Sequence, residues 1–209
     1  MGGVAGRTSA MPHDTSAFAA RFLSVIEDDI VPKTRAGVAA GNKIFGAAIL
    51  KKDDLSVVVA DTNKETENPL FHGEILTLNT FYQLSAGSRP AARDCLFLST
   101  HEPCPLCLAA ITWAGFDNFT YLFGYEDTRD AFAIPHDLKI LEEVFGVANG
   151  GYRRDNAFWT CQSLAELMAK APATERAELS ARIDALGKTY AGLSAIYQAQ
   201  KGQTDIPLS

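Results

Sequence analysis

The chain has 209 residues, of which 47% are hydrophobic and 21% charged, a composition that is ordinary for one globular domain. Its net charge of −6 and pI near 5.2 argue against a basic surface for nucleic acid. Four cysteines are too few for a disulfide scaffold, and the sequence shows neither a signal peptide's apolar run nor a stretch that could span a bilayer. We therefore expect a cytoplasmic protein without membrane or nucleic-acid partners.

The beginning of the chain predicts helices followed by a hairpin. Residues 1–12 are expected to be flexible, and Asp14 or Thr15 can cap a helix with a regularly spaced apolar face. Pro32 is expected to end or kink this helix, and a second short helical piece follows it. Two short apolar runs on either side of a charged turn within 44–60 predict a β-hairpin.

The middle of the chain alternates between helix and strand patterns. Helical spacing of apolar residues alternates with short, mostly apolar runs that are typical of buried strands. The expected order is helix 73–86, strand 94–99, helix 104–114, strand 118–123, loop 124–135 and a helix that ends at 145. This order predicts the α/β class, a three-layer α/β/α sandwich around a mixed sheet with parallel central strands.

The pattern changes after Gly146. A polar, glycine-rich stretch precedes an aromatic patch at 157–159, and Thr174 can cap a long C-terminal helix. Apolar residues recur in that helix at alternating steps of four and three, so it packs either on its own domain or along a partner helix. We expect one domain over 13–160 and a C-terminal helical extension over 161–209.

Two short motifs carry the residues of a metal site. Cys104 and Cys107 are three positions apart, so both side chains face the same way from the first turn of a predicted helix. Pro103 suits the start of that helix, and the positive helix end favours thiolates. His72, at the start of the neighbouring helix, is the natural third ligand. One imidazole and two thiolates fill three corners of a zinc tetrahedron and leave the fourth for water, as in catalytic sites.

Glu74 lies two residues beyond His72, an offset at which helical side chains point in different directions. It is therefore badly placed as a fourth ligand and well placed as a proton carrier. A carboxylate there can take a proton from water that the metal activates and pass it to a leaving amine. These residues predict hydrolytic deamination, with Glu74 as the catalytic residue and Zn²⁺ as the cofactor.

The same residues allow a second kind of metal site. A structural zinc site could take His101 or Cys95 as a fourth ligand, and the cysteine pair alone could serve redox chemistry or core packing. Cys95 and Cys161 are otherwise expected in the core. His13 and His136 are assigned no role.

The two motifs resemble those of a known family. His-Gly-Glu at 72–74 and Pro-Cys-Pro-Leu-Cys at 103–107 match the H-x-E and P-C-x-x-C signature of zinc-dependent deaminases. Residues from about 13 to 145 resemble the cytidine-deaminase-like superfamily, in the branch that contains guanine deaminases, fungal cytosine deaminases and tRNA adenosine deaminases. The run 99–114 is most similar to guanine deaminases, whereas the glycine at 73 resembles fungal cytosine deaminases.

The resemblance implies several substrate contacts. Asn63 matches an asparagine that hydrogen-bonds the base ring, although asparagine is also a common turn residue. The backbone of Gly73 matches a donor to a ring carbonyl, and the backbone of Glu102 matches an acceptor for the departing amine. The Cys104 N–H is expected to help hold the attacking oxygen. Phe71 could stack on the base or belong to the core.

The resemblance also implies a homodimer that pairs across the helices holding the metal. It implies a fifth, apolar strand after residue 145, where this sequence is polar, and a shorter C-terminal end. We expect the long C-terminal helix to pack beside Phe158 and Trp159 and to steady a lid over the pocket, which makes Trp159 a further candidate for substrate contact.

The main interpretation is a zinc hydrolase that removes an exocyclic amine from a small heterocycle, a free nucleobase of the guanine or cytosine type, and releases ammonia. The second is a nucleoside or tRNA adenosine deaminase, against which the acidic balance argues. The third is a catalytically silent deaminase fold that serves as an interaction module, against which the intact Glu74 argues.

Overall fold

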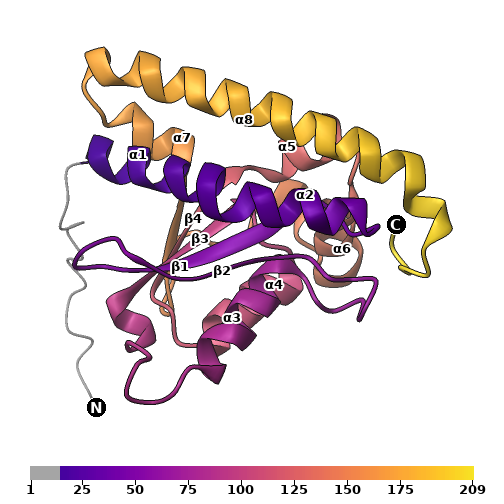
Figure 1. The fold of residues 1–209 in the computed structure, drawn as a ribbon, viewed down its shortest axis with the longest axis horizontal. Helices are drawn as coiled ribbons and strands as arrows, with labels where there is room; N and C mark the ends of the chain where they lie inside the picture. Colours follow the sequence, from indigo (N-terminus) through magenta and orange to yellow (C-terminus); the bar gives the residue numbers. More distant parts are fainter. Residues whose placement is uncertain (1–14) are drawn as a thin grey trace.

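The computed structural model describes residues 15–209, so the predicted flexible segment 1–12 and the capping residue Asp14 lie outside the described residues. Its strands are β1 (Gly46–Lys51), β2 (Val57–Thr62), β3 (Cys95–His101), β4 (Asn118–Phe123) and β5 (Thr160–Ser163). They form a five-stranded mixed sheet in the order β2-β1-β3-β4-β5, in which β1 pairs antiparallel with β2 and β3 while β3, β4 and β5 are parallel. Helices cover both faces, which confirms the three-layer sandwich (Figure 1).

Burial explains which strands the sequence predicts well. Every residue of β3 is buried, as expected for a central strand with helices on both faces, and five of the six residues of β1 are buried. The family resemblance implies a fifth strand after residue 145, but the polar stretch that follows residue 145 does not form it. The fifth strand of the sheet is β5. It comes later, is short and mostly half-buried, and occupies the sheet edge beside β4. A short polar strand is tolerated at an edge. β5 runs across the predicted domain boundary at residue 160.

The first helices form one continuous helical segment. α1 (Thr15–Val25) passes through a π-helical turn, η1 (Ile26–Ile30), into α2 (Val31–Ala39). Pro32 lies in the first turn of α2, and the wider turn comes immediately before it because proline has no N–H for the regular helical bond. The prediction that Pro32 ends or kinks the helix is corrected: the hydrogen-bond ladder changes there, yet the chain stays helical.

Two helices lie on the face of the sheet opposite to α1 and α2, and the predicted metal ligands lie at the beginnings of these two helices. α3 (Gly73–Gln83) packs on β1 and β2, and α4 (Pro105–Trp113) packs beside α3 (Figure 1). Pro105, and not Pro103, occupies the first turn of α4, and Cys104 directly precedes the helix. Proline is favoured in this first turn because the first N–H groups of a helix have no helical partner.

The segment after β4 is more helical than predicted. The loop expected over 124–135 contains a short helix, α5 (Tyr125–Asp130). α6 (His136–Phe145) follows as predicted and ends at Gly146, which adopts the left-handed conformation with φ 66°. Glycine is the residue that ends helices in this way at no steric cost. After β5 the chain forms α7 (Leu164–Ala169).

The long C-terminal helix α8 (Ala173–Gln200) packs on its own domain beside α1, α2 and α7 (Figure 1). Its buried residues, among them Tyr190 and Leu193, join the core that α1 and α2 form over the sheet. The interpretation of its spacing as a helix that packs on its own domain is confirmed. The expected contact with Trp159 is wrong, because Trp159 belongs to the core on the other face of the sheet. No helix within residues 15–209 has the length and apolarity that crossing a membrane requires.

We predict that α8 stabilises the whole domain. Leu193 is 3% exposed, so Leu193→Ala should lower the free energy of unfolding by about 2–5 kcal/mol through lost burial and the cavity left behind. Ile196 lies on the same helix but is 52% exposed, so Ile196→Ala should change it by no more than about 0.5 kcal/mol. Urea unfolding followed by circular dichroism measures both values, and equal effects would contradict this packing.

Candidate metal and catalytic site

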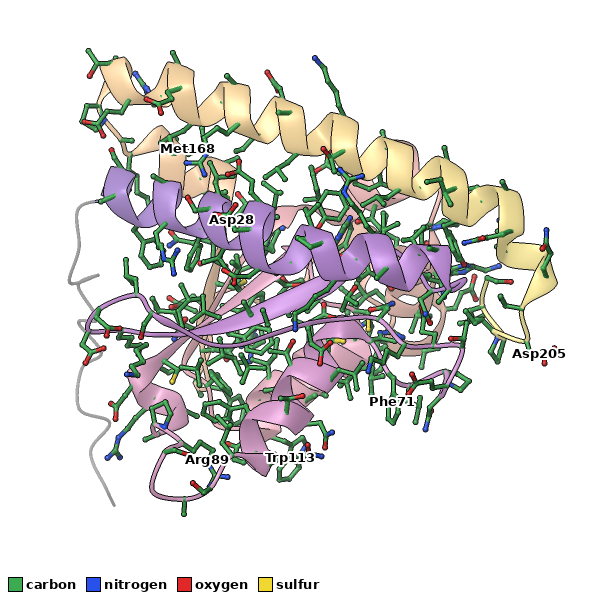
Figure 2. The ribbon with its side chains drawn as sticks, in the orientation of Figure 1. Asp28, Phe71, Arg89, Trp113, Met168 and Asp205 are labelled. Atoms are coloured by element: carbon green, nitrogen blue, oxygen red, sulfur yellow. The ribbon has the colours of Figure 1, made fainter. Side chains whose placement is uncertain are left out.

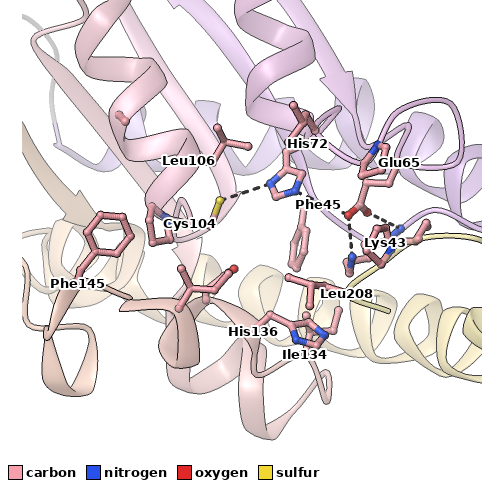
Figure 3. Close-up of a pocket in the computed structure, with 18 residues that line it drawn as sticks. Lys43, Phe45, Glu65, His72, Cys104, Leu106, Ile134, His136, Phe145 and Leu208 are labelled. Atoms are coloured by element: carbon pink, nitrogen blue, oxygen red, sulfur yellow. Dashed lines mark hydrogen bonds and ion pairs between the residues drawn. The ribbon is translucent and has the colours of Figure 1, made fainter. Parts of the chain in front are cut away.

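The predicted metal ligands lie at the beginnings of two neighbouring helices. His72 directly precedes α3, Cys104 directly precedes α4, and Cys107 lies in the first turn of α4. The free N–H groups and the dipole at a helix start favour negatively charged thiolates. Two helix starts therefore bring one imidazole and two sulfurs to a common point (Figure 3).

The three ligand atoms have the spacing of a tetrahedral zinc site. His72 Nδ1 lies 3.4 Å from Cys104 Sγ and 3.6 Å from Cys107 Sγ, and the two sulfurs are 3.6 Å apart. Zinc bonds of about 2.3 Å to sulfur and about 2.0–2.1 Å to nitrogen separate tetrahedral ligand atoms by roughly 3.5–3.8 Å. The donor set and its spacing therefore fit zinc. Within the described part of the chain, these residues form the group of side chains close enough to share an ion.

Neither residue considered as a fourth ligand joins this group. His101 shares a hydrogen bond of 2.9 Å with Thr100 through Nδ1, and its ring packs against aromatic rings. Cys95 lies at the opposite end of β3, where burial raises the pKa of its thiol to about 11. Among residues 15–209 the protein ligands therefore number three. Three ligands are typical of catalytic zinc, whereas structural zinc usually has four.

Glu74 lies beside the metal ligands without joining them. Its side chain is buried, and the Ser99 hydroxyl donates to its Oε1 at 3.0 Å. It lines a small cavity together with His72 and Cys104. Burial and the negative charge of Cys104 raise the pKa of Glu74. A raised pKa brings a carboxyl group closer to the range in which it exchanges protons efficiently.

The site gathers negative charge that a divalent cation would offset. The hydrogen bond between the two cysteine side chains holds the pKa of Cys104 well below its usual value, whereas burial raises the pKa of Cys107. Burial also lowers the pKa of His72, but the hydrogen bond to Cys104 and the charges of Cys104, Glu74 and Glu65 raise it on balance to about 9. Zinc binding would therefore release protons from the cysteine and histidine side chains, and the charge of the zinc ion would then balance the thiolates in place of these protons.

The start of α3 is in contact with β1 through two glycines. A Cβ atom on Gly73 would lie 2.7 Å from the Cα of Gly46, and a Cβ atom on Gly46 would overlap the side chain of Ile30. Only glycine lets the backbone of α3 come this close to the strand. The contact explains why glycine stands between His72 and Glu74.

A second, larger cavity of about 510 Å³ also reaches the metal ligands His72 and Cys104 (Figure 3). Most of its lining is apolar and includes the C-terminal segment 206–208. This segment, and not the helix α8, comes closest to the predicted lid. The other polar side chains that line this cavity are Lys43, Glu65, His136 and Asp137.

These polar lining residues are absent from the predicted site. Asp137 lines both cavities, and burial together with the charges of Cys104 and Glu74 raises its pKa well above the usual value. In the sequence, Asp137 is an acidic residue in the first turn of a predicted helix. Acidic residues are common there because they interact favourably with the helix dipole, so the position alone does not indicate a function. Glu65 follows Asn63 by two residues in a polar loop, and only its burial distinguishes it from a surface charge.

Asn63 and Gly73, both predicted to contact the base ring, are hydrogen-bonded to each other. Asn63 Oδ1 accepts the Gly73 N–H at 2.5 Å, and Asn63 Nδ2 donates to Glu65 Oε2 at 2.8 Å. Asn63 is fully buried and lines neither of the two cavities. In the present conformation these groups are therefore engaged within the protein, and their contact with substrate stays a prediction.

The remaining predicted substrate residues have different surroundings. Glu102 lines the small cavity, and its carboxylate accepts hydrogen bonds from Tyr152 at 2.8 Å and Arg154 at 3.0 Å. Phe71 is half-buried beside the start of α3 and lines neither cavity (Figure 2). Trp159 packs in the core beside β4 and also lines neither cavity. Substrate contact by Phe71 or Trp159 stays a prediction.

Residues 30–123 match the family model described as "Cytidine and deoxycytidylate deaminase zinc-binding region". The chain is 32% identical over 97 residues to a guanine deaminase of Bacillus subtilis (strain 168), an alignment that spans 46% of this chain and 60% of that protein. Among solved structures, a guanine deaminase from Nitrosomonas europaea has 22% identity and a TM-score of 0.48, with 85% of this chain and 87% of that chain covered. A tRNA:A34 deaminase has 20% identity and a TM-score of 0.46, with 75% of this chain and 99% of that chain covered.

Two helix starts on a mixed sheet bring together one histidine, two cysteines and a nearby glutamate, which are the residue types of the zinc-dependent deaminase signature. The match to the zinc-binding region of cytidine and deoxycytidylate deaminases covers a little under half of the chain. This region contains His72, Cys104 and Cys107, and zinc is the cofactor that these three residues are placed to hold.

We predict that Gly73→Ala disturbs the metal site through the contact with β1. Its Cβ would meet the Gly46 backbone, which cannot move aside as a flexible side chain could, so stability should fall by about 1–3 kcal/mol. The zinc content should fall as well, because Gly73 lies between His72 and Glu74. Gly87→Ala is the control, since a Cβ there meets nothing within 4 Å. Urea unfolding and metal analysis measure both effects. Equal responses from the two variants would speak against the role of the contact.

Proposed function

We propose that the protein is a zinc-dependent hydrolytic deaminase that removes an exocyclic amine from a small heterocycle, a free nucleobase of the guanine or cytosine type, and releases ammonia. The observation that carries this proposal is the tetrahedral spacing of His72, Cys104 and Cys107, together with the buried Glu74, which lines a small cavity with two of these ligands, His72 and Cys104. A structural zinc site has no use for a buried carboxyl group that is not a ligand.

The residues of the site have separate tasks. His72, Cys104 and Cys107 would hold zinc, which supplies a Lewis acid that lowers the pKa of water. Glu74 takes a proton from the attacking water and delivers it to the leaving nitrogen, so the amine departs as ammonia and the ring keeps the oxygen. Ser99 fixes the orientation of the Glu74 carboxyl group by donating a hydrogen bond to Oε1.

Asp137 lines both cavities and Glu102 lines the small one, so these two groups are best placed to orient a ring that is held in the larger cavity beside the zinc ligands. Burial and the charges of Cys104 and Glu74 raise the pKa of Asp137, which favours the protonated form that can donate a hydrogen bond to a ring acceptor. Asn63 and Gly73 are also proposed ring contacts, and this role requires the hydrogen bond between them to open as substrate enters.

Two observations support a free base as the substrate. A relative that matches the chain is a guanine deaminase, which makes a purine or pyrimidine base the first substrate to test. The net charge of −6 disfavours a polyanionic substrate such as tRNA, whose binding depends on basic side chains.

We also propose that the protein is a cytoplasmic homodimer. Trp113 on α4 is 91% exposed and Leu106 on the same helix is 39% exposed, which is apolar area that a single chain leaves uncovered. Both cysteine ligands lie at the start of α4, the helix that carries Trp113 and Leu106. The family resemblance implies that two subunits pair across the helices that hold the metal. All four cysteines are free thiols, which suits a reducing compartment.

We predict that the zinc-loaded protein releases ammonia from at least one free base in a panel of guanine, cytosine, adenine and related aminated heterocycles. The corresponding nucleosides and a tRNA transcript should react more slowly, because the proposed substrate is a free base. A coupled assay for ammonia measures all of these rates. A fully zinc-loaded protein that released no ammonia from any member of the panel would rule out the proposed reaction.

Glu74→Gln separates metal binding from proton transfer. The amide keeps the shape of the side chain but cannot carry the proton, so turnover should fall by roughly 10²–10⁴-fold while the zinc content stays unchanged. Glu142→Gln, an exposed position on α6, should leave both quantities unchanged. Near-normal turnover in Glu74→Gln would remove Glu74 from the mechanism.

Trp113→Glu tests the proposed dimer. A buried aromatic residue at an interface often carries much of its binding energy, so the dimer dissociation constant should rise by at least about tenfold. Ile196→Glu is the control, because Ile196 is also exposed but lies on α8, which packs on the other face of the sheet from α4 (Figure 1). Sedimentation equilibrium measures the association of each protein. A wild-type protein that is monomeric at all accessible concentrations would refute the dimer.

A further inference from the structure

Glu65 is a buried carboxylate to which the reaction described above assigns no task. It lies in the loop between β2 and α3 and is 3% exposed. Lys43 Nζ donates to its Oε1 at 2.7 Å, and Asn63 Nδ2 donates to its Oε2 at 2.8 Å. A buried carboxylate is costly unless partners compensate for its lost hydration. Lys43 and Asn63 supply that compensation.

The oxygen that binds Lys43 also faces the zinc ligand His72. Glu65 Oε1 lies 3.8 Å from His72 Nε2 (Figure 3). Because Nδ1 is the ring nitrogen next to the two sulfurs, a metal-bound His72 carries its proton on Nε2, on the side of Glu65. Histidines that bind metals usually direct this second N–H at a carboxylate, a carbonyl or a water molecule, which fixes the ring and its tautomer.

The other oxygen of Glu65 leads to the start of α3. It holds Asn63, and Asn63 in turn accepts the N–H of Gly73. Gly73 lies between the ligand His72 and the proton carrier Glu74. One carboxylate is therefore linked to the imidazole through Oε1 and to the backbone that carries both functional side chains through Oε2.

We propose that Glu65 is the positioning residue of the metal site, holding the His72 ring in the orientation that presents Nδ1 to zinc. Lys43 balances the buried carboxylate, and Asn63 extends its hold to the start of α3. Because this inference rests on the zinc site of the proposed function, we test it by zinc binding and by the state of His72 rather than by turnover. Weaker zinc binding in the variants below, with no ammonia from any base, would support the positioning role and reject the deaminase.

Glu65→Gln keeps the size of the side chain and removes its charge. We expect the zinc dissociation constant, measured by competition with a chromogenic chelator, to rise by roughly 10–100-fold. Glu67→Gln is the matched control, because Glu67 lies in the same loop but is exposed, and it should bind zinc like the wild type. Unchanged zinc affinity in Glu65→Gln would overturn the proposal.

A double variant separates positioning from charge balance. Lys43→Met alone leaves the carboxylate buried without its cation, so its melting temperature should fall. Adding Glu65→Gln removes both charges and should recover much of that loss. If Glu65 positions His72, the double variant keeps the weak zinc affinity of Glu65→Gln. Recovery of wild-type zinc affinity in the double variant would show that Glu65 only neutralises Lys43, and would overturn the proposal.

A measurement on the unmodified protein does not depend on any variant folding. In ¹⁵N-labelled, zinc-loaded protein, the His72 Nε2 proton should be visible by NMR and exchange slowly with water, because it points at a buried carboxylate. Exchange as fast as that of a free imidazole would overturn the proposal.

Discussion

The backbone contact between Gly46 of β1 and Gly73 of α3 sets the position of everything that the site needs. It fixes how deeply the start of α3 lies on the sheet, and so where His72 and Glu74 stand relative to the cysteines of α4. Two hydroxyl groups reinforce it. Thr100 donates to the Gly46 carbonyl at 3.1 Å, and Thr77 of α3 donates to the Ala47 carbonyl at 3.2 Å. Side chains larger than hydrogen at the two glycines would push the helix off the strand, and zinc geometry tolerates little displacement.

The other face of the sheet supports the site from behind. Tyr190 of α8 packs edge-on against His101, the last residue of β3, with ring centroids 5.3 Å apart. Ser194 of α8 donates to the Phe132 carbonyl at 2.6 Å, in the loop that precedes α6 and its cavity-lining residue Asp137. The C-terminal helix therefore supports the wall of the cavity from inside the domain, while the C-terminal segment 206–208 lines the cavity itself.

The metal site can be predicted from the sequence because the residues that form it lie in two short motifs. The offset between Cys104 and Cys107, a helix start and a preceding strand place both sulfurs without reference to the rest of the fold. The central strands are equally legible, since they are apolar on both faces. The features that the sequence does not predict depend on contacts between residues that are far apart in the chain. In the sequence Glu65 and Asp137 look like surface acids, but the fold buries Glu65 and half-buries Asp137 at the cavity. The hydrogen bond of Asn63 depends on where Gly73 lies, and the polar edge strand β5 has no apolar pattern that would predict it.

X-ray absorption at the zinc edge, combined with metal analysis of protein purified without chelators, measures most directly whether three protein ligands hold zinc and leave one position open. We predict about one zinc per chain, with two sulfur neighbours at about 2.3 Å and two nitrogen or oxygen neighbours at about 2.0–2.1 Å, of which one is a single imidazole. A shell with three or four sulfurs or two imidazoles would indicate a closed structural site. That result, or failure to bind zinc on reconstitution, would contradict a catalytic metal held by His72, Cys104 and Cys107.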